Sequence, residues 1–213
     1  MPSVPLFCGS TASATIKVTS PALTIPPAGD RLTLGGIDWI VLDENDGNGN
    51  ALIVTASTHG NSQFRTAANQ GNAYAGSRLE TSMKAFYDQL KPEVKDRVQP
   101  VVLPNESVSF GTQTWNPWSI SGGLSSVGGS NETAFALSYG EVQKYMGWTP
   151  SRTAYTSINS SFQVAPPDRW WLRSVGGSSA SAGVVHSNGQ VYGSTGVTST
   201  IGIRPALWIS LNQ

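Results

Sequence analysis

The sequence predicts an α+β domain, because the patterns typical of strands, then of helices, then of strands again follow one another along the chain. Residues 31–42 have the pattern of a β-hairpin, and capping boxes at Ser77 and Ser138 predict the starts of two main helices. Strand patterns dominate from Trp170 onward. A chain of 213 residues favours one domain, at residues 30–213. Residues 1–29, which end in a proline pair, are expected to form an N-terminal arm or attachment segment.

The first expected element is a hairpin. Residues 31–34 and 37–42 are its strands, and Gly35-Gly36 is its turn. A polar stretch from Asp43 to Asn50 then leads into a strand at residues 51–54. The oxygen-bearing side chains of that stretch could bind calcium, although Gly47 occupies the fifth position, where an EF-hand has a ligand. A hairpin turn is the favoured interpretation.

Two helices are expected next. Ser77 and Glu80 form a capping box, and the apolar residues Leu79, Met83, Phe86 and Leu90 follow at helical spacing. Pro92 bounds this helix, and a short helical turn is expected after it. Ser138 and Glu141 repeat the capping-box pattern before the second helix.

The rest of the chain divides into a long loop and a strand-rich end. Residues 107–133 are rich in Gly, Ser and Trp without a period, which is typical of a loop that binds something or packs on itself. Residues 183–192 surround an Asn188-Gly189 turn and predict a hairpin, and residues 203–209 predict a final strand. Trp39, Trp171 and Trp208 lie within apolar strands and are expected in the core.

Charge and hydropathy exclude two classes of partner, nucleic acid and the interior of a membrane. Charged side chains make up 12% of the chain, and 13 basic residues balance 13 acidic ones. Phosphate binding needs a concentrated excess of Lys and Arg, so nucleic acid is not expected as a partner. No apolar run is long enough to cross a bilayer, so direct membrane insertion is not expected. The N-terminal residues also lack the basic start and long apolar stretch of a signal peptide.

The sequence offers little for catalysis, and we expect no enzymatic activity. Beyond Glu141 the only carboxylate is Asp168, so the C-terminal third cannot hold a carboxylate pair. His59 and His186 belong to no metal-binding motif, and Cys8, the single cysteine, has no candidate base nearby. Neither a cofactor nor metal ligands are therefore expected.

Two motifs carry a resemblance to a known family. Residues 168–174 read Asp-Arg-Trp-Trp-Leu-Arg-Ser, and residues 202–209 read Gly-Ile-Arg-Pro-Ala-Leu-Trp-Ile. Together with residues 36–42, the helix from Ser77 and residues 135–142, they resemble the C-type-lectin-fold variable proteins of diversity-generating retroelements. These proteins have relatives in a large bacterial and phage family and share the scaffold of formylglycine-generating enzymes. The cysteines on which those oxidases depend are missing from this domain.

The resemblance implies a C-type-lectin-like fold with two main helices and a β-rich C-terminal variable region at about residues 170–208. A fixed scaffold that includes Trp171, Leu172, Arg173, Arg204, Pro205 and Leu207 would hold side chains varied by mutagenic copying of a template. Mutation of the adenines in an Asn codon AAC cannot produce Lys, Glu, Gln, Met or Trp. Between Ser174 and Ile201 only Gln190 falls outside the reachable set.

The side chains expected to contact a ligand are short polar groups with Tyr and His as anchors among them. They are Ser178, Ser179, Ser181, Val185, His186, Ser187, Tyr192, Ser194, Thr195, Thr198, Ser199 and Thr200.

The resemblance therefore implies a ligand- or receptor-binding protein with a diversified face, on a phage tail virion or a bacterial cell surface. Its expected partner is a cell-surface protein or a glycan. The N-terminal arm would suit virion attachment or the formation of a homo-oligomer. The alternative is a structural virion or surface domain that uses the same face for assembly.

Overall fold

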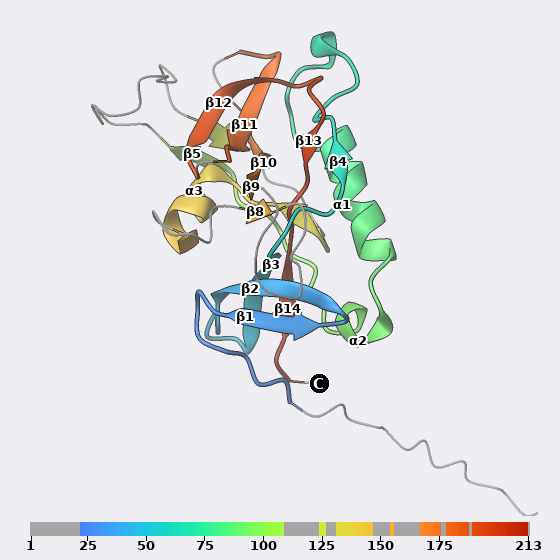
Figure 1. Cartoon of the computed structure of the whole chain (residues 1–213), viewed down its shortest axis with the longest axis vertical. Helices are drawn as coiled ribbons and strands as arrows, with labels where there is room; N and C mark the ends of the chain where they lie inside the picture. The colour runs from blue at the N-terminus through green and yellow to red at the C-terminus, as the bar shows by residue number, and fades with distance from the viewer. Residues whose placement is uncertain are drawn as a thin grey trace, which may run out of the picture.

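The structure is a computed structural model that describes residues 22–108, 124–126, 131–146, 154–155, 167–175, 178–187 and 189–212. Two β-sheets lie one above the other in Figure 1, and a helix runs along one side of both. Residues 1–21 of the expected N-terminal arm lie outside the described residues, as does much of the 107–133 loop. None of the helices in the described ranges is long and apolar enough to cross a membrane.

The lower sheet has five strands in the order β1-β2-β3-β14-β7. Their bounds are β1 Arg31–Leu34, β2 Ile37–Asp43, β3 Asn50–Thr55, β14 Pro205–Ser210 and β7 Phe135–Ala136. The expected first hairpin is confirmed, with Leu34 opposite Ile37. Gly35 and Gly36 both have positive φ, 67° and 79°, which suits the tight turn between antiparallel strands.

The upper sheet has seven strands and carries most of the C-terminal region. Its main path is β12 Val191–Gly196, β11 Ser181–Val185, β10 Trp170–Val175, β13 Ile201–Gly202 and β4 Asn61–Ser62. On a side branch, β6 Leu124–Ser126 pairs with β10 and with β5 Glu106–Val108. A separate pair joins β8 Ala154–Tyr155 to β9 Pro167–Asp168.

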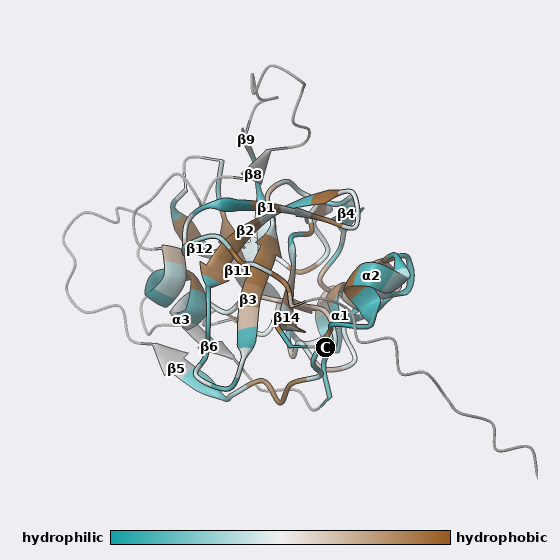
Figure 2. Cartoon of the chain, turned by 90° about the horizontal axis from the view of Figure 1, so that it is seen from below, coloured by the Kyte–Doolittle hydropathy of each residue, from teal (hydrophilic) through white to brown (hydrophobic). Residues whose placement is uncertain are grey.

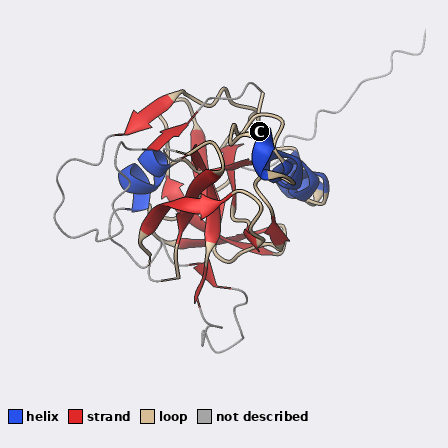
Figure 3. Ribbon diagram, turned by 90° about the horizontal axis from the view of Figure 1, so that it is seen from above, coloured by secondary structure: helices blue, strands red, loops and turns tan. Residues whose placement is uncertain are grey.

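The helices flank the strands on two sides (Figure 3). They are α1 Arg78–Asp88, α2 Pro92–Lys95, α3 Tyr139–Glu141, the 3-10 turn η1 Ala68–Gln70 and the π-helical turn η2 Val142–Met146. Helix α1 begins as expected, because the Ser77 hydroxyl accepts a hydrogen bond from the Glu80 amide at 2.9 Å. Its Leu79, Met83 and Phe86 side chains are buried against the sheets.

The expectation of an α+β, C-type-lectin-like fold with two main helices is wrong. Strands dominate the described residues, and α1 is the only helix there longer than two turns. The Ser138 capping box is real, but α3 passes into a π-helical turn at Val142 after three residues. A capping box marks where a helix can begin and says nothing about its length. Strands of two residues, such as β4, β7 and β13, are too short to show a period.

The core lies between the sheets and α1, where the strands are mostly apolar (Figure 2). Trp39, Trp170 and Trp171 are fully buried. The indole N–H of Trp171 donates to the Ser62 carbonyl at 2.8 Å, which ties β10 to β4 across the intervening β13. Trp208 departs from expectation, because it is half-buried on β14 and lines a surface hollow together with Val102, which is 77% exposed.

Candidate binding face

Strand β12 presents its side chains on two sides. Val191 and Gly193 face inward, whereas Tyr192, Ser194 and Gly196 alternate with them on the exposed side. The neighbouring β11 is buried along its whole length. Among the described strands, β12 pairs with β11 alone and is therefore the edge of the upper sheet. The exposed side chains of β12 thus belong to a strand that pairs with a fully buried one.

One end of this hairpin carries an aromatic pair. The turn is closed by hydrogen bonds from His186 N to Gln190 O at 2.7 Å and from Gly189 N to His186 O at 2.8 Å. The rings of His186 and Tyr192 meet edge to face with centroids 5.2 Å apart. The Tyr192 hydroxyl donates to Gln190 Oε1 at 2.8 Å, and Ser187 Oγ lies 3.1 Å from His186 Nδ1. Two half-exposed rings are therefore held in one arrangement.

The opposite end is formed by two turns packed side by side, residues 178–181 and residues 196–200. The Val197 amide donates to the Ala180 carbonyl at 3.0 Å, and the Ser199 amide closes its own turn on Gly196 O at 2.9 Å. In Figure 1 these turns lie at the top of the molecule beside the loop that carries η1. Along β12, Tyr192 and Gly196 are four residues apart, or about 13 Å, so the hairpin has two distinct ends.

A loop before α1 holds both turns through their main chains. Asn72 Nδ2 donates to the carbonyls of Ser178 and Ser181, each at 2.8 Å. Gln63 Nε2 donates to the Thr198 carbonyl at 2.8 Å, and the Arg65 amide donates to the Val197 carbonyl at 2.9 Å. These bonds would survive a change of side chain at any of the accepting residues.

Sequence reasoning missed this loop, and nothing in its pattern would have revealed it. Arg65 stiffens it, because its two Nη atoms donate to the carbonyls of Ala73, Ala75 and Gly76 at 2.6–3.1 Å. Residues 63–76 have neither a helical nor a strand period, and the bonds that define their role all reach main-chain oxygens. A sequence does not display such acceptors, because every residue has one.

The expected contact residues fall into three groups by exposure. Those exposed are Ser178, Ser179, Ser194, Thr198 and Thr200; those partly exposed are His186, Ser187, Tyr192, Thr195 and Ser199; those buried are Ser181 and Val185. Ser181 is 8% exposed and its hydroxyl donates to the Ser178 carbonyl, while Val185 is fully buried in the core. These two residues therefore cannot offer their side chains to a ligand.

Most of the exposed hydroxyl groups of the candidate face have no hydrogen-bond partner among the described residues. Among the described residues, the side chains of Ser179, Ser194, Thr195, Thr198 and Thr200 make no hydrogen bond; Ser178 makes a local one, accepting from the Ala180 amide at 3.3 Å. A Cβ added at Gly196 would meet only Ser199 Oγ at 3.7 Å, an ordinary contact distance. The exposed end therefore has room and free hydrogen-bonding groups.

Two buried arginines anchor the strands beneath this face. Arg173, fully buried on β10, donates to both carboxylate oxygens of Glu141 and to the Ala136 carbonyl. Arg204 donates to the Thr55 carbonyl at 2.7 Å and lies 5.1 Å from the Trp170 ring. Burial lowers the pKa of Arg204 to about 9. The other residues expected in the scaffold, Trp171, Leu172, Pro205 and Leu207, are buried too.

The stretch from Asp43 to Asn50 satisfies its own hydrogen bonds. Asp46 accepts from the Asn48 and Asn50 amides at 2.7 and 3.1 Å and from the Asn50 side chain at 3.0 Å. The Asn50 side chain and the two amides keep the pKa of Asp46 below its usual value. This is the geometry of a polar hairpin turn. In the ranges that the structure describes, no group of three or more His, Cys, Asp or Glu side chains could hold a metal ion.

One carboxyl pair is buried elsewhere, between α1 and the residues before β7. Glu132 is 3% exposed and hydrogen-bonds to Glu80, which also accepts from Lys84 Nζ at 2.5 Å. Burial, followed by the charge of Glu80, raises the pKa of Glu132. Burial raises the pKa of the neighbouring Tyr74 phenol as well. The side chain of Glu132 is closed off from any substrate, so the pair is suited to a structural role.

The comparisons with known proteins identify a family. The family described as "Domain of unknown function (DUF6273)" matches residues 48–211, which is well over half of the chain. The match covers the upper sheet and β3, β14 and β7 of the lower sheet, and it begins after β1 and β2. No curated protein and no solved structure matches the chain. The chain belongs to the DUF6273 family.

Proposed function

We propose that this protein is a ligand-binding protein whose exposed C-terminal face recognises a cell-surface protein or glycan. The proposal rests on one observation: at that face, main-chain groups are held by hydrogen bonds, whereas several side-chain hydroxyls have no partner in the described part of the chain. Asn72, Gln63 and Arg65 hold the turns by their carbonyl oxygens, while the hydroxyls of Ser179, Ser194 and Thr198 are free to bond a ligand. Preorganised main chain with uncommitted short polar side chains favours binding, because little conformational freedom is lost.

The same arrangement favours a face whose side chains can be replaced without a change in main-chain conformation. A turn held by its carbonyls keeps its shape when its side chains are replaced, which is what a diversified surface requires. The resemblance of residues 168–174 and 202–209 to variable proteins of diversity-generating retroelements leads to the same proposal. Under it, the protein acts without a cofactor or catalysis, on a phage tail virion or a bacterial cell surface.

A binding comparison on intact protein tests the proposal. A variant with Arg at Ser179, Ser194 and Thr198 is compared with a control with Arg at the exposed Thr33 and Asp88, on β1 and α1. We expect both to melt like the parent chain, and only the face variant to lose binding to cells or glycans captured by the parent. Equal binding by both variants, or no selective binding by any natural sibling of this chain, would contradict the proposal.

Natural variation provides a second readout. Sequencing of the gene across its source population should show changes concentrated at the exposed codons of residues 178–200, beside a template repeat and a reverse transcriptase. An invariant segment would argue for a fixed ligand instead.

A second candidate function rests on the open edge of β12. An edge strand can pair with another chain through its free main-chain groups. The face would then be an assembly contact of a structural virion or surface domain. Replacement of His186 and Tyr192 separates the two functions: loss of assembly favours the structural role, whereas intact assembly with lost binding favours recognition.

A further inference from the structure

A groove runs along the exposed flank of α1. The described residues of the proposed face do not line it, although its Arg65 end adjoins the turn at residues 196–200. It consists of two adjoining hollows, of about 450 and 530 Å³, that share Ser82 and Ala85 as their common floor. On the helix, Arg78, Ser82, Ala85 and Gln89 follow at intervals of four, three and four residues and so lie on one side. From Arg78 to Gln89 the helix rises about 16 Å, which sets the length of the groove.

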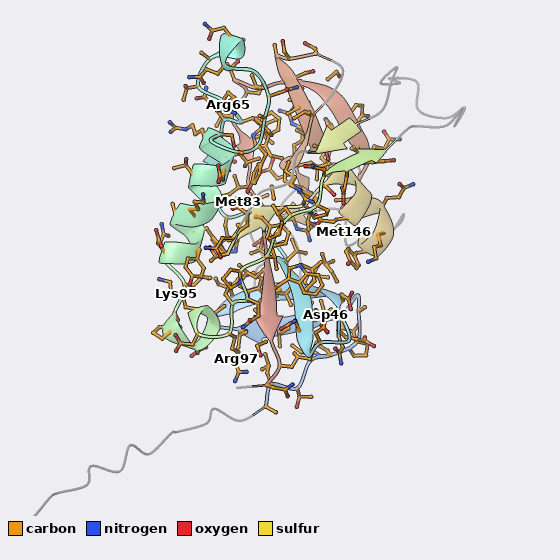
Figure 4. The ribbon with its side chains drawn as sticks, turned by 180° about the vertical axis from the view of Figure 1, so that it is seen from behind. Asp46, Arg65, Met83, Lys95, Arg97 and Met146 are labelled. Atoms are coloured by element: carbon orange, nitrogen blue, oxygen red, sulfur yellow. The ribbon has the colours of Figure 1, made fainter. Side chains whose placement is uncertain are left out.

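The end of the groove nearest η1 is positively charged. Arg65 and Arg78 both line it, and none of the carboxylates in the described part of the chain lines either hollow. Figure 4 shows Arg65 in the loop above the start of α1. Its Nη atoms are fixed by main-chain carbonyls, while its Nε is buried without a hydrogen-bond partner. Arg78 is exposed and has no ion pair within the described residues. One guanidinium is thus held rigidly and the other is free to close on an anionic group.

The other end of the groove is uncharged and partly apolar. His59 and Phe86 meet edge to face with ring centroids 5.1 Å apart, next to Ile203. Burial lowers the pKa of His59, so its ring is neutral at neutral pH. The remaining side chains that line this end are two short hydroxyls, an amide and a methyl group: Thr58, Ser82, Gln89 and Ala85.

We propose that this groove binds an acidic oligosaccharide, with a sugar carboxylate at Arg65 and Arg78 and a following sugar ring beside His59 and Phe86. Sugars combine hydroxyl groups with apolar ring faces, and the groove offers partners for both along its length. A peptide with many carboxylates would meet cations at one end only. The inference does not rest on the proposed function, since none of the described residues between 178 and 200 lines either hollow.

The test is a calorimetric titration of the full chain with trigalacturonic acid and, as a matched neutral probe, its methyl ester. We expect the acid to bind at least about tenfold more tightly than the ester, because a charge-assisted bond to arginine is lost on esterification. Arg78→Gln should weaken binding of the acid by about the same factor. Arg31→Gln, an exposed arginine on β1, is the matched control and should leave binding unchanged. Ala85→Phe, on the exposed floor, should abolish binding of both probes.

Three results would overturn the inference: no binding of the acid, equal binding by the parent and Arg78→Gln, or equally tight binding of hexaglutamate. The triple Arg variant of the proposed face should bind trigalacturonic acid as the parent does. This outcome keeps a failure of the face separate from a failure of the groove.

Discussion

The hydroxyl groups of three buried serines and those of the candidate face differ in one respect: the three serines accept hydrogen bonds from main-chain amides, whereas most hydroxyls of the face have no partner among the described residues. Ser77, Ser138 and Ser174 are buried, and their Oγ atoms accept from the amides of Glu80, Glu141 and Tyr139 at 2.8–3.0 Å. Ser194 and Thr198 are exposed, and their hydroxyls make no bond in the described part of the chain. The same residue types therefore stabilise the scaffold in one region and remain available to a ligand in the other.

The largest expected effect comes from the scaffold. Arg173→Met removes the charged partner of the Glu141 carboxylate, leaves it only the Ser138 amide as a donor among the described residues, and should lower the free energy of unfolding by about 3–5 kcal/mol. Urea denaturation measures the change, with Arg169→Met, an exposed arginine, as control. A loss equal to that of the control would show that the ion pair does not anchor β10.

Gly202 and Gly196 are expected to differ in how well they tolerate an added side chain. A Cβ at Gly202 would lie 2.7 Å from the Arg169 carbonyl oxygen and 2.7 Å from Thr58 Cγ2, whereas a Cβ at Gly196 has room. Gly202→Ala should therefore cost about 1–3 kcal/mol in unfolding free energy, and Gly196→Ala less than about 0.5 kcal/mol. Thermal melts of the two variants measure both. Equal melting temperatures would contradict the contrast between scaffold and face.

Serine and threonine substitutions compare the scaffold with the face without replacing a glycine. Ser138→Ala and Ser77→Ala each remove a helix cap and should cost about 1 kcal/mol. Ser194→Ala and Thr198→Ala should stay within about 0.5 kcal/mol of the parent. Chemical denaturation of the four single variants is the measurement. A destabilisation by Ser194→Ala as large as that by Ser138→Ala would mean that the face is part of the scaffold.

The smallest expected effect depends on pH. The raised pKa of Glu132 means that its protonated form favours the folded state, a contribution fully present below the ordinary glutamate pKa of 4.5. This contribution is lost as the pH rises through the raised folded-state pKa. Glu80, Lys84, Tyr74 and Arg173 are the charged or titratable groups around it. When denaturation is measured from pH 4 upward, the free energy of unfolding should decline less steeply for Glu132→Gln than for the parent chain. Glu93→Gln, on exposed α2, is the control; a decline unchanged by Glu132→Gln would exclude the pair as its source.

Local elements could be predicted from the sequence, because their signals are local. The Gly35-Gly36 turn and the Ser77 cap are correct to the residue, since positive φ and side-chain capping are properties of single positions. The fold class was wrong, because strands of two residues such as β4 and β13 exist only through their partners. For the candidate face, exposure could be predicted for Ser194, but the burial of Val185 depends on a register that no local pattern displays.

The parallel pairing of Trp170 with Gly202 brings the two ends of the candidate variable segment side by side. The chain departs from this point and returns beside it, so residues 171–201, which begin with the buried scaffold residues Trp171, Leu172 and Arg173, form a cassette with adjacent ends. A cassette of this kind can change in length at modest entropic cost, because the cost of closing a loop grows only slowly with the number of residues. Turns of a different length within residues 171–201 could therefore be accommodated between the same two attachment points.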